Sequence, residues 1–184
     1  MSKRMVVPGI LALLALLLVL GPLASLAQDK PATRGKIYAA VLKYIQDKGW
    51  KFSENTEKAT ITLGFKGDNG SFQCVGLARE AEEQFVFCSI SPLKVPADKR
   101  AAMAEFIIRV NDSLAIGNFD MNWDTGNVTY RTSIDVEGDR LAPALTKNLI
   151  ASNIRMMDKY LPGITAVLNN ISPAAAVAKI RDKK

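Results

Sequence analysis

Alternating apolar residues on both sides of a tight-turn signal constrain the fold of this chain more than any other feature. Ile61, Leu63 and Phe65 alternate with small or polar residues, and a second alternating run begins at Phe72. Asp68-Asn69-Gly70 lies between the runs, and Asn-Gly tolerates the positive φ that a hairpin turn needs. Strands that a short turn connects must be antiparallel neighbours. The sequence therefore predicts an antiparallel sheet.

The rest of the chain supplies helices on either side of further strands. Residues 53–58 read as a polar loop, and Pro162 lies off the apolar stripe of the last long helix, which we expect to bend rather than stop there. The predicted order is α-β-β-β-α-β-β-α plus a short C-terminal helix. This order gives an α+β fold, with an antiparallel five-stranded sheet and helices on one face. The predicted helices and strands are 37–48, 60–65, 72–79, 84–90, 96–116, 119–124, 128–136, 143–168 and 173–184.

The N-terminus has the features of a secretory signal peptide. Lys3 and Arg4 precede an uncharged run over residues 5–27, and Gly21-Pro22 interrupt this run before Ser25-Leu26-Ala27. A basic start, an apolar core and small residues at the end are typical of a cleaved signal. We expect residues 1–27 to be removed and the protein to be periplasmic or secreted. The alternative is an uncleaved membrane anchor, because the run is just long enough to span a bilayer.

The mature chain then divides into one domain and a tail. Residues 28–171 are expected to form the α+β domain, and residues 172–184 a short helix that ends in a cluster of basic residues. The full chain carries a net charge of +6, and most of these charges are scattered. Nucleic-acid binding would need cations on one face with interleaved aromatic residues, which the sequence lacks. We expect at most a weak contact of the basic tail with a membrane surface.

Composition argues against catalysis. The chain has no histidine, which excludes Ser-His-Asp and Cys-His nucleophiles and any histidine-ligated zinc site. No phosphate-binding glycine-rich loop and no pair of catalytic carboxylates emerge. We expect no catalytic residues, no metal and no cofactor.

The two cysteines are candidates for a disulfide. If the loop between the second and third strands holds an odd number of residues, positions that sum to 162 pair across the hairpin, and Cys74 then faces Cys88. Directly opposed residues lie within reach of a disulfide, which an oxidising compartment favours. The alternative is two small buried thiols.

The same hairpin is apolar on both faces. With that register, Val75, Leu77, Phe85 and Phe87 share one face. A sheet face that no helix covers needs a partner, and these four residues are the candidate binding surface. The alternative is that the final long helix of the chain covers them.

Five polar residues call for separate interpretations. Asp120, Asn122 and Asp124 begin like a calcium-binding loop, but the glycine and the glutamate that should follow are absent. We interpret them as an exposed strand face, on which Arg131 pairs with Asp120 or Asp124. Asn111, near the end of its helix, is expected to bond the backbone of the following turn.

Several spaced motifs, together with the order of elements, resemble the YbjN family of bacterial sensory transduction regulators over residues 35–170. The motifs are Val95-Pro96-x-x-Lys99-Arg100, Arg109-Val110-Asn111-x-x-Leu114, Gly117-Asn118-Phe119 and Gly126-Asn127-Val128-Thr129-Tyr130-Arg131. The resemblance implies a fold similar to type III secretion chaperones, which are small, dimeric, non-enzymatic binders of other polypeptides. This chain departs from them, because they are typically acidic and cytoplasmic.

These observations lead to one expectation and one alternative. We expect an exported, non-enzymatic module, chaperone-like or regulatory, that binds an envelope polypeptide and forms a homodimer. The alternative is a carrier of a lipid or small apolar ligand, which would require a cavity between the sheet and the helices.

Overall fold

The computed structural model describes residues 35–181. Six strands and four α-helices follow in the order α-β-β-β-β-α-β-β-α-α, with two short 3₁₀ turns between them. The strands are β1 (Ser53–Asn55), β2 (Thr60–Lys66), β3 (Ser71–Arg79), β4 (Gln84–Lys94), β5 (Asn118–Met121) and β6 (Asn127–Asp135). The helices are α1 (Lys36–Asp47), α2 (Arg100–Asn111), α3 (Pro143–Leu168) and α4 (Pro173–Arg181).

All strands belong to one antiparallel sheet in the order β1-β2-β3-β4-β6-β5. The predicted α+β class is confirmed, but the prediction of five strands is wrong. The sixth strand is β1, a three-residue edge strand in the segment predicted to be a polar loop. All three of its residues are exposed, so the segment has no alternation of apolar and polar residues that could reveal a strand.

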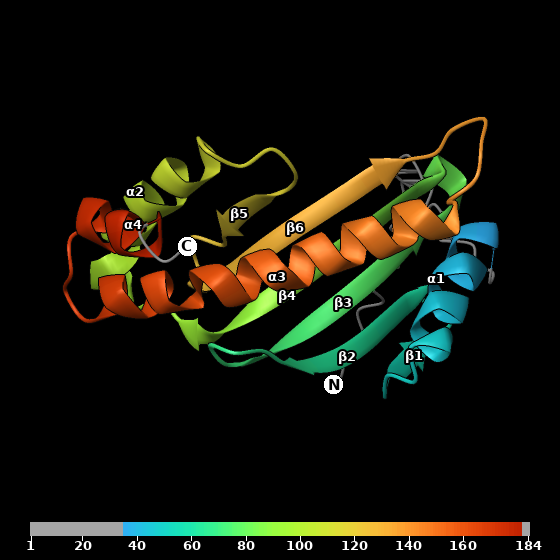
Figure 1. Cartoon of the computed structure of the whole chain (residues 1–184), viewed down its shortest axis with the longest axis horizontal. Helices are drawn as coiled ribbons and strands as arrows, with labels where there is room; N and C mark the ends of the chain where they lie inside the picture. The colour runs from blue at the N-terminus through green and yellow to red at the C-terminus, as the bar shows by residue number, and fades with distance from the viewer. Residues whose placement is uncertain (1–34, 182–184) are drawn as a thin grey trace, which may run out of the picture.

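The helices lie on one face of the sheet. Figure 1 shows α3 running obliquely over the sheet, where it contacts β4 and β6. The helix α1 lies near the first turns of α3, and α2 and α4 are grouped near β5 at the opposite end of the molecule. The helix α3 continues through Pro162, as the sequence predicts. We call this face of the sheet the covered face and the opposite one the open face, on which the described residues place no helix.

The core fills the space between α3 and the covered face. Phe85 and Phe87 of β4 are at most 1% exposed, and Ile150, Met157 and Ile164 of α3 are completely buried against the sheet. Burial of these large apolar side chains removes the most surface from water, so this layer supplies most of the driving force for folding.

A carboxylate from a distant loop caps the N-terminus of the first helix. The Glu80 side chain, which follows β3, accepts hydrogen bonds from the backbone N–H groups of Tyr38 at 2.7 Å and Ile37 at 3.3 Å. A negative charge at a helix N-terminus satisfies free donors and interacts favourably with the helix dipole. This contact joins α1 to the β3–β4 connection.

The two ends of the chain lie outside the described residues. The predicted signal peptide, residues 1–27, and the alternative membrane anchor both fall there, as do the last basic residues of the tail. Among the helices of residues 35–181, none has the length and apolarity that a membrane span requires.

Candidate functional site

The register of β3 and β4 differs from the prediction. Four residues, 80–83, connect the strands, and Arg79 pairs with Gln84 at the closed end. An even loop makes paired positions sum to 163, so Cys74 lies opposite Ser89, and Cys88 lies opposite Val75. Neighbouring residues of a strand point to opposite faces of the sheet.

The predicted disulfide is therefore wrong. Cys74 lies on the covered face and Cys88 on the open face, so the sheet separates the two thiols, and both cysteines are free. Of the two readings that the sequence left open, the structure gives free thiols, of which only Cys74 is fully buried.

The surroundings of the two thiols differ. Burial raises the pKa of Cys74 to about 11, although its Sγ lies 3.3 Å from Ser89 Oγ. Partial burial also raises the pKa of Cys88, against the opposing effect of the Arg131 guanidinium. Because the thiolate is the reactive form, neither cysteine is activated as a nucleophile.

The predicted binding surface is divided between the two faces. Phe85 and Phe87 lie beneath α3 in the core, so assigning them to an accessible surface is wrong. Here the alternative, coverage by the chain's own long helix, describes the structure. Val75 and Leu77 do lie on the open face, where both are half-buried.

The open face carries a continuous group of apolar side chains, which we call the apolar strip. Its members belong to the two central strands β3 and β4, and all are half-buried. Polar residues of β2 and β6 flank it on both sides, among them Thr62 and Ser133. The members of the apolar strip are Val75, Leu77, Val86, Cys88 and Ile90.

Sequence reasoning missed Val86, Cys88 and Ile90 as members of this surface. The signal that finds them is the number of loop residues, since Glu80-Ala81-Glu82-Glu83 is an even connection. A one-residue slip in register exchanges the two faces of a strand.

A shallow hollow continues the apolar strip at one end of the open face. Its volume is about 580 Å³, and it is lined by residues of β2, β3 and β4 that include Gly64, Gln73 and Ile90. A Cβ placed on Gly64 would meet nothing within 4 Å, so the surface is open at this point. The strip and the hollow together form the candidate site.

An ion pair borders the apolar strip beyond Cys88. Arg131 of β6 lies 3.1 Å from Asp120 of β5, as expected, and the two side chains are half-exposed. Partial burial nevertheless raises the pKa of Asp120, because the loss of hydration outweighs the attraction of the guanidinium.

The β5 edge of the sheet is closed to strand addition at its centre. The Asn111 carboxamide accepts a hydrogen bond from the Phe119 N–H and donates one to the Phe119 carbonyl, both at 2.9 Å. It therefore occupies the two backbone groups that an added strand would use. Asn111 does bond backbone groups, but they belong to Phe119 in β5 and not, as the sequence predicted, to the turn that directly follows α2.

A buried polar network holds α3 on the opposite side of these strands. Asn153 of α3 donates to the carbonyl oxygens of Phe87 at 2.8 Å and Tyr130 at 3.0 Å. Its own oxygen accepts from Ser89 Oγ at 2.6 Å. Every polar group of this side chain is satisfied, and the helix is fixed to β4 and β6 in one register.

Several residues of the motifs that carry the family resemblance connect neighbouring elements of the fold. Lys99 donates to the Leu168 carbonyl at the end of α3, and Arg100 donates to the Asp124 carbonyl at 3.1 Å. Gly126 has a φ of +72°, and a Cβ there would lie 2.0 Å from the Val95 carbonyl oxygen. These motifs fix how α2, β5 and β6 meet, and none of them contributes to the apolar strip.

The fold is similar to that of three solved structures of low sequence identity. YbjN from E. coli is 13% identical over 71% of this chain and 88% of its own, with a TM-score of 0.49. The ExsC-ExsE complex contains a chain that is 12% identical over 68% of this chain and 91% of its own, with a TM-score of 0.48. The HopA1-SchA chaperone-effector complex contains one that is 16% identical over 66% of this chain and 90% of its own, with a TM-score of 0.42.

The sequence itself was compared with curated proteins and with family models. No curated protein matches it at a significant level. The family model "YbjN: Putative bacterial sensory transduction regulator" matches residues 38–166, which cover α1 from its third residue, the whole sheet and nearly all of α3. The chain therefore belongs to the YbjN family.

Proposed function

We propose that this protein is a non-enzymatic module that binds a polypeptide segment through the apolar strip, after export to the cell envelope. The observation that supports this function is the strip itself. Five half-buried apolar side chains lie side by side on the two central strands, on a face that no described helix covers. A sheet buries such a face against another layer of structure.

The shape of the strip favours the apolar side of a helix as its ligand. From Leu77 to Gln73 the strip and the adjoining hollow extend about 13 Å along β3 at about 3.3 Å per residue. An α-helix of about nine residues has this length at 1.5 Å per residue. On the covered face, α3 shows that this sheet accepts a helix laid across it, since α3 packs on β4 and β6. We therefore propose that the partner presents an amphipathic helix.

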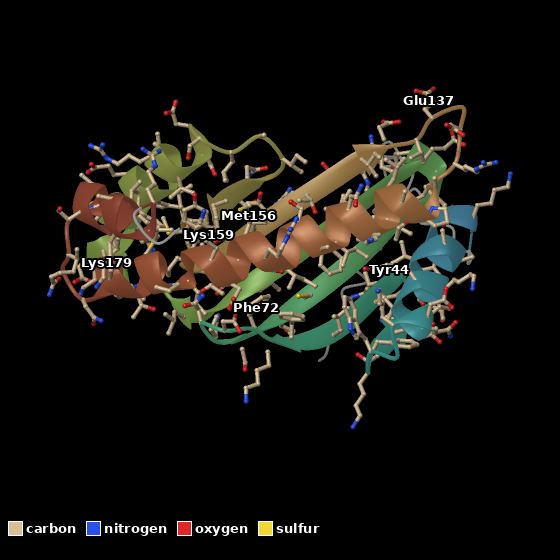
Figure 2. The ribbon with its side chains drawn as sticks, in the orientation of Figure 1. Tyr44, Phe72, Glu137, Met156, Lys159 and Lys179 are labelled. Carbon is tan, nitrogen blue, oxygen red and sulfur yellow. The ribbon has the colours of Figure 1, made fainter. Side chains whose placement is uncertain are left out.

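Site-specific photo-crosslinking tests this function. A photoreactive phenylalanine analogue replaces Val86 in the strip or, as a control, the exposed Glu137 in the β6–α3 loop (Figure 2). We expect a discrete crosslinked polypeptide from Val86 in host envelope fractions and none from Glu137. The additional substitution Leu77→Glu should abolish the product, while an unchanged thermal unfolding curve shows that the domain is folded.

The mass of the product separates the possible occupants. A product with twice the mass of this chain would identify a second copy and support the homodimer that the sequence suggests. An intramolecular product would mean that the chain covers its own strip, and it would refute partner binding there. Equal crosslinking from Val86 and Glu137 would also refute it.

Export is tested separately. Mass spectrometry of the protein from fractionated host cells should find a chain that begins after Ala27, in the periplasm or the medium. An intact N-terminus in the membrane fraction would support the anchor, and an intact cytoplasmic chain would refute export.

A further inference from the structure

A second hollow lies on the helical side of the molecule, on the opposite side of the sheet from the apolar strip. Its volume is about 560 Å³, within the range of small-molecule sites. It lies where the second half of α3, the β2–β3 turn and α4 meet. Figure 2 marks Lys159 on α3 and Lys179 on α4, which both line it.

The walls of this pocket are fixed by direct contacts. Asp158 of α3 accepts hydrogen bonds from the backbone N–H groups of Asn69 at 2.9 Å and Asp68 at 3.1 Å, which secures the turn. On the other side, a Cβ on Gly163 would lie 2.3 Å from Ile180 Cδ1, so α4 packs directly on α3. The pocket therefore exists before any ligand binds, and the cost of ordering it is already met.

The charges at the pocket are unbalanced. Arg155 and Lys159 are four residues apart on α3, and Lys179 faces them from α4. Within residues 35–181, none of these three cations forms an ion pair with a carboxylate. The pocket lining contains two carboxylates, Asp68 and Asp158. Both oxygens of Asp158 already accept hydrogen bonds from the backbone of the β2–β3 turn. Like charges at this helical spacing repel, and a bound anion relieves the repulsion.

The remaining lining is apolar. Pro162, Gly163 and Ala166 come from α3, and Ala176 and Ile180 come from α4. We propose that the pocket binds a small organic anion, with its carboxylate or phosphate group at the three cations and a short apolar body against this wall. This site is independent of the polypeptide-binding function proposed above, since it involves the opposite side of the sheet.

Isothermal titration calorimetry of the purified protein with three probes tests the proposal. The probes are hexanoate, 1-hexanol and inorganic phosphate. Charge and apolar body together should make hexanoate the strongest ligand, with 1-hexanol at least tenfold weaker because it lacks the charge. Phosphate should also be weaker, because it lacks the apolar body. The absence of heat from all three would overturn the proposal.

Matched lysine variants locate the binding. The double variant Lys159→Ala/Lys179→Ala should lower the affinity for hexanoate at least tenfold. The control Lys147→Ala, at an exposed position of α3, should leave this affinity unchanged. All three lysines are exposed, so these variants should fold normally. Equal losses in both variants would show a nonspecific charge effect and overturn the site. Phosphate binding as tight as hexanoate binding would overturn the role of the apolar wall.

Discussion

The two faces of the β3–β4 hairpin carry apolar side chains of similar number but very different environment. On the covered face, Phe87 is completely buried, and the polar atoms of Ser89 and Asn153 bond one another. On the open face, Val86 and Leu77 keep part of their surface in water. An apolar pattern alone therefore does not distinguish a strand face that becomes the core from one that stays partly exposed. Four experiments test this contrast.

The largest difference should come from deleting side chains. Phe87→Ala should lower the free energy of unfolding by about 3–5 kcal/mol, because it leaves a cavity beneath α3. Leu77→Ala on the open face should cost about 1 kcal/mol or less, because less surface is buried there. Urea denaturation measures both values. Equal losses would show that the open face is as fully covered as the other.

Removal of the buried amide comes next. Asn153→Ala should lower the free energy of unfolding by about 3 kcal/mol, since it leaves the partners of that side chain without their hydrogen bonds. Asn148→Ala, an exposed position on the same helix, should change it by less than about 0.5 kcal/mol. Similar urea midpoints for the two variants would contradict a fixed position for α3.

Alkaline pH should lower the free energy of unfolding through the buried thiol of Cys74. The folded pKa of Cys74 is about 11 against an ordinary value of 9.0, so the folded state keeps this proton after the unfolded state has lost it. The contribution to stability is complete below pH 9 and falls as the pH rises toward 11, by about 2–3 kcal/mol in total.

This decline is measured from the free energy of unfolding at about pH 8.5, 9.5 and 10, which span the ordinary pKa of a thiol. Cys74→Ala should flatten the decline more than Cys88→Ala, because Cys88 is only partly buried. The same slope in both variants would contradict the deeper burial of Cys74.

The smallest effect should come from the ion pair on the open face. Arg131 and Asp120 are 51% and 36% exposed, so solvent screens their attraction. A double-mutant cycle with alanine should give a coupling energy below about 1 kcal/mol that decreases in high salt. A coupling above 2 kcal/mol would show that this part of the open face is shielded from water.

Much of the fold could be predicted from periodicity. The Asp68-Asn69-Gly70 turn, the alternation in β6 and the long stripe of α3 all lie where the sequence places them. The three-residue strand β1 could not be predicted, because exposed polar residues at an edge carry no periodic signal. The cap that Glu80 provides for α1 was equally hidden, since its two partners are more than 40 residues away in the chain.

The candidate site was predicted only in part. The hairpin is the correct one, and Val75 and Leu77 belong to the open face. Phe85 and Phe87 were misassigned because an odd loop was assumed, and the same assumption placed the two cysteines opposite each other. The pocket between α3, the β2–β3 turn and α4 gave no sequence signal, because its lining comes from three segments that only folding brings together.

Apart from the edge strand β1, the order of helices and strands, the antiparallel hairpins and the family can be read from the sequence, because each depends on local spacing and on residues close in the chain. Which face of the β3–β4 hairpin becomes the core depends instead on contacts between distant segments. Both faces are apolar enough to be buried, and α3 can cover only one. The even connection after Arg79 and the bonds of Asn153 place Phe87 under that helix. Within residues 35–181 no helix covers the other face, which is why we propose that a partner binds there.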